Sequence, residues 1–181
     1  MERGIAVFGS SEPLPGDPLY EQARTLGRLL AEAGQLVVTG AYGGVMEAAS
    51  RGALEAGGRT FGVACEIFDR RPNSYLTGTG SSTDLHVRQR ELVDRSKGFV
   101  VLEGKAGTLS ELALLWALHR AGCLERRPVV LLGGAWKDLL IFLEGNRILE
   151  APQLQICDVA ETAQAALDAL RLRLAENEER R

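Results

Sequence analysis

The sequence of 181 residues has little cysteine, little lysine and no long apolar run. Its three cysteines, Cys65, Cys123 and Cys157, are far apart and show no CxxC spacing, which argues against a disulfide framework and against a zinc site. No apolar run approaches the ~18 residues that a membrane span needs. The first apolar run begins at Ile5, which is too early for a signal peptide. We therefore expect a protein of a reducing compartment, the cytoplasm, with no membrane partner.

Lysine occurs only at Lys97, Lys105 and Lys137, so nearly all of the 21 basic residues are arginines. The 24 acidic residues bring the net charge to -3. Because the chain has no overall positive field, we expect no nucleic acid polymer as a partner. Arginine suits bidentate contacts with phosphate or carboxylate better than lysine does, which favours a small anionic ligand.

Short runs of strand type alternate with longer helical patterns along the chain. The strand-type runs cover 5–8, 36–39, 60–65, 98–102 and 128–132, and the helical patterns cover 17–34, 45–56, 84–96, 108–121 and 136–143. This alternation predicts the α/β class, with a mostly parallel, doubly wound sheet and helices on both faces. No linker or repeat interrupts it, so we expect a single domain over 1–175. The remaining tail, 176–181, is charged and expected to fray.

Two stretches have a less regular pattern. Residues 66–84 are dominated by polar residues, Pro and Gly, and predict a long loop with room for one short strand. Asp158 to Glu161 has the composition of a helix cap, so we expect the last helix to begin there.

Three turns between a strand and a helix are rich in small residues. In a doubly wound sheet such turns place backbone N–H groups at helix N-termini, where phosphate is favoured. The alternative is that the glycines only make tight turns, and for any one turn the two interpretations are evenly balanced. Three turns together favour a phosphorylated ligand. The candidate binding residues are Gly9, Ser10, Gly40, Gly43, Gly44, Gly104, Lys105, Gly107 and Thr108.

Several standard signatures are absent. No GxGxxG or GxxxxGK[ST] occurs, which disfavours an ordinary dinucleotide dehydrogenase or NTPase. His86 and His119 have no partner at a metal or triad spacing, and no serine lies in a Gly-x-Ser-x-Gly elbow. Nothing in the sequence indicates a cofactor or a metal. Met46, Trp116 and Trp136 are interpreted as packing residues.

The order of residue types over 88–111 is distinctive. Residues 88–92 and 103–111 resemble the RKxxM and PGGxGTxxE motifs of the lonely guy (LOG) family, also labelled "lysine decarboxylase-like". Residues 37–48 resemble the glycine turn of the family's Gly-Val-Met-Glu branch, which is similar to molybdenum-cofactor carrier proteins, and the resemblance extends over about 4–135. It implies a Rossmann-like fold, a homodimer and hydrolysis of the N-glycosidic bond of a nucleoside 5′-monophosphate to free base and ribose 5-phosphate.

The resemblance also assigns roles to residues. It implies Arg88 and Glu111 as the catalytic pair and Gly104, Gly107 and Thr108 as the phosphate loop. The chemistry agrees, because a carboxylate can stabilise an oxocarbenium-like state and orient or deprotonate the attacking water. A guanidinium is always charged and suits electrostatic work rather than proton transfer.

Each of these assignments has a structural alternative. Thr108 and Glu111 have the spacing of a capping box, in which both side chains would satisfy N–H groups at a helix start. Arg88 could be a solvated charge on a helix face, and Arg90 is the decoy beside it. Glu47, where better-studied members have glycine, could be a second carboxylate of the site, although the outer face of its helix is the preferred interpretation.

The chain also departs from the family pattern. Glu103 replaces proline, Lys105 replaces glycine and Gln89 replaces lysine. Glu103 would weaken anion binding unless Lys105 compensates for its charge or its side chain points away. Neither Lys97 nor Lys105 lies in a pyridoxal phosphate motif, so lysine decarboxylation is rejected. Two hypotheses remain: a phosphoribohydrolase, which is preferred, and a non-catalytic carrier of a phosphorylated cofactor or nucleotide.

Overall fold

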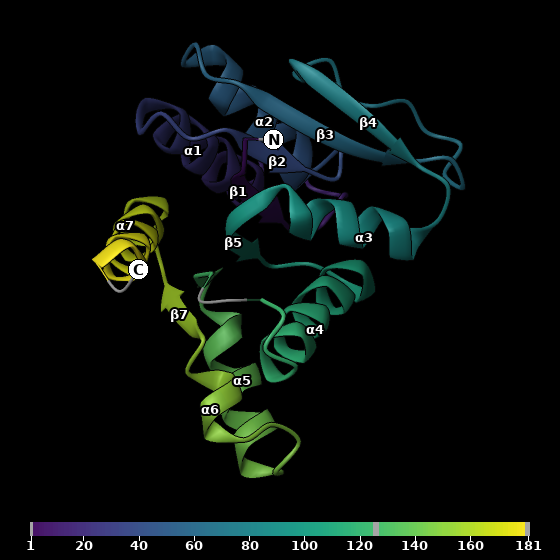
Figure 1. Ribbon diagram of the computed structural model, residues 1–181. Helices are drawn as coiled ribbons and strands as arrows, with labels where there is room; N and C mark the ends of the chain where they lie inside the picture. Colours follow the sequence, from purple (N-terminus) through teal and green to yellow (C-terminus); the bar gives the residue numbers. More distant parts are fainter. Residues whose placement is uncertain (1, 125–126, 180–181) are drawn as a thin grey trace.

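The computed structural model describes residues 2–124 and 127–179, which form one sheet with helices on both sides (Figure 1). The strands are β1 (Gly4–Phe8), β2 (Val37–Thr39), β3 (Thr60–Cys65), β4 (Gly78–Ser82), β5 (Ser96–Leu102), β6 (Val129–Leu132) and β7 (Cys157–Ala160). The helices are α1 (Pro18–Glu32), α2 (Val45–Glu55), α3 (Leu85–Asp94), α4 (Ala106–Arg120), α5 (Ala135–Gly145), α6 (Ala151–Leu154) and α7 (Ala163–Glu179).

The seven strands pair in the order β4-β3-β2-β1-β5-β6-β7, and every pairing is parallel. The predicted α/β class and Rossmann-like fold are therefore confirmed. The chain builds the sheet outward from β1 to one edge and then returns to the other side of β1 with β5. This reversal is a topological switch point, where ligands bind beyond the carboxyl ends of the strands in open α/β sheets.

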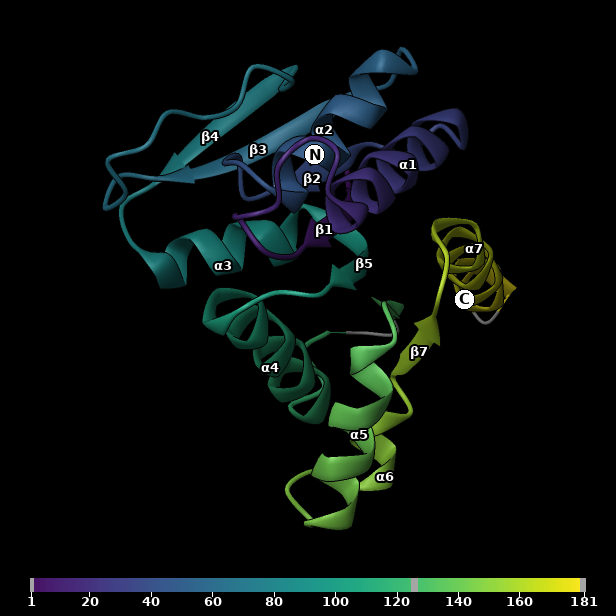
Figure 2. The same ribbon diagram turned by 180° about the vertical axis from the view of Figure 1, so that it is seen from behind.

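The two faces of the sheet follow from the period of two along each strand. Ile5 and Val7 of β1 pack against α1, α2 and α7, whereas Ala6 and Phe8 pack on the opposite face, where α3, α4 and α5 lie. Figure 2 shows α3, α4 and α5 together on that side, apart from α1 and α7. Because both faces are covered, β1 and β6 carry no polar side chain, and β5 is apolar from Phe99 to Leu102.

The C-terminal part differs from the sequence-based expectation. Asp158 does not cap a helix: it lies in strand β7, and its carboxylate accepts hydrogen bonds of 2.8 and 2.9 Å from Arg173. The last helix begins at Ala163, and Thr162 Oγ1 accepts from the backbone N–H of Ala165. Helix α7 then continues to Glu179, past the expected start of a fraying tail.

The expectation for residues 66–84 is confirmed. The long loop does contain a short strand, β4, at the edge of the sheet, and the three cysteines are free. Among the described helices, none combines the length and the hydropathy that crossing a membrane would require.

Candidate functional site

A cavity of about 220 Å³ lies at the switch point, beyond the carboxyl ends of β1, β2 and β5. Three elements of the sequence prediction meet here: the turn after β1, the turn after β2 and the turn between β5 and α4. Helix α3 contributes one side chain and the loop after β3 contributes two. The lining residues are Val7, Phe8, Gly9, Ser11, Gly40, Tyr42, Met46, Phe68, Arg70, Arg88, Lys105, Gly107, Thr108 and Glu111.

Arg88 is not a solvated charge, because only 7% of it is exposed. Its Nε atom donates to the carbonyl of Val63 at 2.9 Å, and Nη2 donates to the carbonyl of Gly40 at 2.8 Å. The guanidinium also lies 5.7 Å from the ring centre of Tyr42, within cation–π range. These contacts hold a permanent positive charge at the cavity wall, while the decoy Arg90 is exposed.

Glu111 lies opposite this charge, with Oε1 at 3.9 Å from Nη1 of Arg88. Its side chain is 14% exposed. Burial raises the pKa of Glu111 from 4.5 to about 7, and the charge of Arg88 opposes that rise only in part. The carboxyl group is thus poised to exchange a proton near neutral pH, as a general base requires.

The capping-box interpretation of Glu111 is wrong. Helix α4 begins at Ala106, with Lys105 as its N-cap and no side chain bonded to the cap. Thr108 and Glu111 therefore lie inside the helix, three residues later than the box requires. The carboxylate of Glu111 does not cap the helix and lines the cavity instead.

The first turn of α4 lies at the same cavity. Gly107 and Thr108 line it, and a Cβ at Gly107 would meet no atom within 4 Å. At Gly104, by contrast, a Cβ would overlap with Thr108 and would lie 2.9 Å from the backbone nitrogen of Ser10. Gly104 lets two turns approach each other, and Gly107 leaves room in front of the helix N-terminus.

Glu103 faces away from this turn. Its carboxylate lies beside Gly133, after β6, at 2.8 Å from where a Cβ of that glycine would be. It does not line the cavity. Lys105 does, and its Nζ atom donates to Glu12 at 2.6 Å in an exposed ion pair. The departure at position 103 thus adds no negative charge to the cavity wall.

The candidate binding residues divide into two groups. Gly9, Gly40, Lys105, Gly107 and Thr108 line the cavity, whereas the others lie behind it, where the turns touch. Ser10 donates its N–H to the carbonyl of Glu103 and accepts from the N–H of Val45. The residues behind the wall are Ser10, Gly43, Gly44 and Gly104.

Sequence reasoning missed the aromatic part of the cavity. Tyr42 and Phe68 meet edge to face, with ring centres 5.5 Å apart at 88°. Met46, interpreted as a packing residue, lines the cavity as well. Tyr42 lies in a predicted turn, but nothing local links it to Phe68 or Arg70, which follow the next strand.

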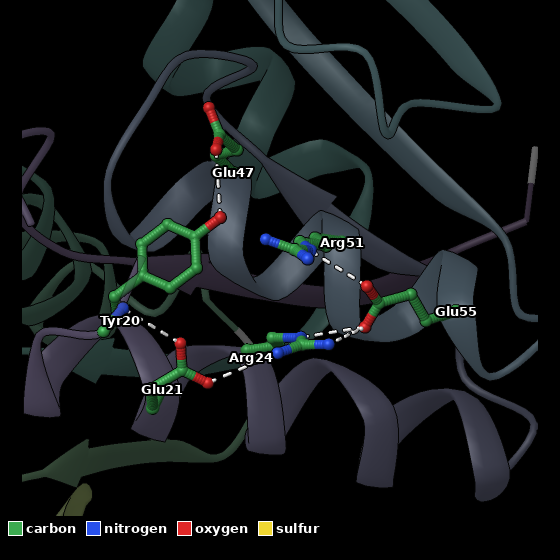
Figure 3. A network of polar contacts seen from close by, with 7 residues as sticks. Tyr20, Glu21, Arg24, Glu47, Arg51 and Glu55 are labelled. Carbon is green, nitrogen blue, oxygen red and sulfur yellow. Dashed lines mark hydrogen bonds and ion pairs between the residues drawn. The ribbon is translucent and has the colours of Figure 1, made fainter. Parts of the chain in front are cut away.

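Glu47 does not join the site. Figure 3 shows it in a network between α1 and α2, where it accepts a hydrogen bond of 2.9 Å from the hydroxyl of Tyr20. Arg24 and Arg51 of the same network both contact Glu55. The expectation that Glu47 lies on the outer face of its helix is therefore wrong, because Glu47 is half-buried and faces α1, where it pairs with the buried Tyr20. Within the described chain, no three His, Cys, Asp or Glu residues are grouped to hold a metal ion.

Comparison with known proteins assigns the chain to a family. The model of the SLOG cluster4 family matches residues 2–155. The chain belongs to this family. The cytokinin riboside 5′-monophosphate phosphoribohydrolase of Rhodococcoides fascians is 29% identical over 148 residues, which are 78% of this chain and 74% of that protein. The resemblance to LOG proteins is thus confirmed.

Solved structures of molybdenum cofactor proteins share the whole fold. The molybdenum cofactor binding protein of Rippkaea orientalis superposes with a TM-score of 0.77 at 23% identity, over 96% of this chain and 98% of that one. The molybdenum cofactor carrier protein of Chlamydomonas reinhardtii gives a TM-score of 0.73 at 25% identity, over 97% and 99% of the two chains. The likeness to both hydrolases and carriers matches the two hypotheses.

Proposed function

We propose that this SLOG cluster4 protein is a nucleoside 5′-monophosphate phosphoribohydrolase. The observation that carries the proposal is the pair of Glu111 and Arg88: a carboxyl group with a pKa of about 7 stands 3.9 Å from a buried guanidinium at the wall of an open cavity. The relative from Rhodococcoides fascians, by its name, hydrolyses such a monophosphate.

In the proposed reaction the ligand phosphate binds at the first turn of α4, near Gly107 and Thr108. Ionised Glu111 accepts a proton from water as the water oxygen bonds to C1′ of the ribose. The C1′–N bond breaks, its electrons go to the base, and the base takes up a proton. The carboxylate also stabilises the oxocarbenium-like state.

Arg88 has a different role in this scheme. Two of its donors are engaged by the carbonyls of Gly40 and Val63, so the guanidinium is fixed rather than free to follow the substrate. Its charge keeps a fraction of Glu111 ionised at neutral pH despite the burial of that carboxyl group. We therefore assign Arg88 to electrostatic positioning of Glu111.

The test is release of ribose 5-phosphate from a panel of nucleoside 5′-monophosphates. Glu111→Gln keeps the shape of the side chain and removes its basicity, and should lower kcat by at least about 100-fold. Arg90→Ala is the matched control, because that arginine lies two residues further along α3, is exposed and does not line the cavity, so its loss should leave kcat unchanged. Release that Glu111→Gln does not diminish, or no release from any member, would overturn the proposal.

A carrier of a phosphorylated cofactor is the second candidate. The Chlamydomonas reinhardtii protein, a molybdenum cofactor carrier by name, matches this chain along nearly all of both lengths. A carrier would use the same helix N-terminus and cavity without turnover. Tight binding of a phosphorylated cofactor, together with no release of ribose 5-phosphate, would select this function.

We also propose a homodimer in the cytoplasm. The dimer follows from the family resemblance, and three free cysteines are typical of reducing compartments. Sedimentation analysis of the purified chain should give twice the mass of 19.5 kDa, and a monomer at micromolar concentration would overturn the assignment.

A further inference from the structure

The loop between β3 and β4 contributes two residues to the cavity that belong to no glycine turn. Phe68 and Arg70 both line it. Phe68 is 38% exposed, which is unusual for a large apolar side chain with a neighbouring aromatic ring. Arg70 is exposed, and within the described part of the chain its guanidinium makes no hydrogen bond or ion pair. The ring of Phe68 and the guanidinium of Arg70 therefore lie at the same wall of the cavity.

This loop is attached to the site on both sides of Arg70. Before it, Phe68 donates its N–H to the carbonyl of Cys65 and packs edge to face on Tyr42. After it, Asn73 donates to the carbonyls of both Ala41 and Tyr42. Tyr42 in turn donates its hydroxyl to the carbonyl of Cys65 at 3.0 Å. The backbone on which Arg70 sits is thus held by contacts two residues before and three residues after it.

The wall formed by Phe68 and Arg70 is separated from the N-terminus of α4 by the order of the strands in the sheet. Phe68 and Arg70 follow β3, whereas Gly107 and Thr108 follow β5, and β2 and β1 lie between. Three strand spacings amount to roughly 14 Å. A ligand whose phosphate binds at α4 therefore extends its other end toward Tyr42, Phe68 and Arg70, with Glu111 and Arg88 in between.

We propose that Phe68 and Arg70 form a base-recognition subsite that selects 6-oxopurines, which deepens the proposed function by naming the base. Phe68 covers the flat face of the base, and the guanidinium of Arg70 donates to its edge. Arginine carries five N–H donors and no acceptor. It can make a two-pronged contact only with an edge that presents two adjacent acceptors.

Among purines, that edge distinguishes hypoxanthine and guanine from adenine. A 6-oxopurine offers N7 and O6, both acceptors, which is the pair that arginine contacts in a bidentate manner. Adenine offers N7 beside an amino group, which is a donor and repels the second prong. The same contact would also stabilise the electrons that the departing base receives, since the guanidinium is always charged.

The experiment is binding of inosine 5′-monophosphate and adenosine 5′-monophosphate to the full chain, measured by calorimetry. Wild-type protein should bind the inosine nucleotide about tenfold more tightly, within the range of one bidentate contact. In Arg70→Ala the two affinities should become equal within about twofold. Arg71→Ala, the neighbouring arginine that does not line the cavity, should keep the tenfold preference.

The experiment measures the affinity for each nucleotide and not its hydrolysis, so its result does not depend on the hydrolase proposal. Equal affinities in the wild type, or a preference that survives Arg70→Ala, would overturn the subsite. A preference that is lost in Arg70→Ala while no nucleotide is hydrolysed would keep the subsite and overturn the hydrolase. Phe68→Leu, which keeps an apolar side chain and removes the ring, should weaken both nucleotides together by about tenfold, as loss of one stacking contact predicts.

Discussion

Gly40 and Arg88 occupy adjoining space that leaves no room for a side chain at position 40. A Cβ on Gly40 would overlap with Nη2 of Arg88 and would lie 2.8 Å from the sulfur of Met46. The carbonyl of the same glycine accepts a hydrogen bond from that Nη2 atom. Gly40 therefore fixes Arg88 in two ways, by bonding to it and by being small.

Gly40→Ala should displace Arg88 and lower both stability and activity. Forcing a methyl group into a filled space costs about 1–3 kcal/mol, and chemical denaturation measures it. Gly107→Ala is the control, since its Cβ would enter open space. The control should fold at least as stably as the wild type, because alanine favours a helix, yet bind inorganic phosphate more weakly. An unchanged midpoint for Gly40→Ala would contradict the packing described.

Arg88→Ala should destabilise the fold as well as abolish activity. It would leave the buried carbonyls of Val63 and Gly40 without their donor, at about 1–3 kcal/mol each. Arg90→Ala should change the free energy of unfolding by less than about 0.5 kcal/mol, as exposed sites do. Equal effects of the two substitutions in urea denaturation would show that the buried contacts of Arg88 do not stabilise the fold.

Glu111→Gln should stabilise the protein at high pH. The folded chain holds the proton of Glu111 up to about pH 7, whereas the unfolded chain loses it near 4.5, so stability falls as pH rises between these values. At about 1.4 kcal/mol per pH unit the penalty reaches about 3 kcal/mol. The variant lacks it, so its advantage in melting temperature should be small at pH 4.5 and largest above pH 7. An advantage independent of pH would refute the raised pKa.

The rate of hydrolysis should depend on the same proton. A general base must be ionised, so kcat/KM should rise with pH and level off above an apparent pKa of about 7. Arg88→Lys replaces the fixed guanidinium by a mobile ammonium group and should shift this limb. A profile that is flat from pH 5 to 9 would exclude Glu111 as the base.

Glu12→Gln should strengthen anion binding. Glu12 and Lys105 form an exposed ion pair at the mouth of the cavity, so the carboxylate competes with a phosphate for the same ammonium group. The variant should bind inorganic phosphate more tightly at low salt, with little difference at high salt. Exposed ion pairs contribute little to stability, so the melting temperature should stay the same. Weaker phosphate binding by the variant would contradict this competition.

The parts of the fold that the sequence predicts are those with a local signal. The glycine turns at 40–44 and 104–108 are visible because small residues between an apolar run and a helical pattern leave few conformations. Strand β7 was missed because Asp158 interrupts its apolar pattern, and its charge is balanced by Arg173 on the following helix, α7. In the sequence alone, an Asp that pairs with an Arg in the folded protein cannot be distinguished from an Asp that caps a helix.

The site itself is predictable only in part for the same reason. Arg88 and Glu111 follow from motif resemblance, but the burial of Arg88 depends on carbonyls of β3 and of the turn after β2, which no local pattern reveals. The capping box would need the helix to begin at Leu109, after Thr108, but it begins at Ala106, so Glu111 lies inside the helix and lines the cavity. Phe68 and Arg70 line the cavity because β3 lies two strands from β1 in the sheet. The hydrophobic pattern of a sequence predicts strands but not their order in the sheet.

The pairing of β1 with β5 bears on how the chain folds. These strands lie side by side although more than ninety residues separate partners such as Gly4 and Ser96. Residues before position 50 supply Gly9, Gly40 and Tyr42, and residues after position 85 supply Arg88, Lys105 and Glu111, so the binding site is incomplete until this long-range pairing is made. Contacts of such sequence separation form slowly. A ligand that bridges these two parts binds only the completed sheet, and by mass action a higher ligand concentration makes the paired state more stable.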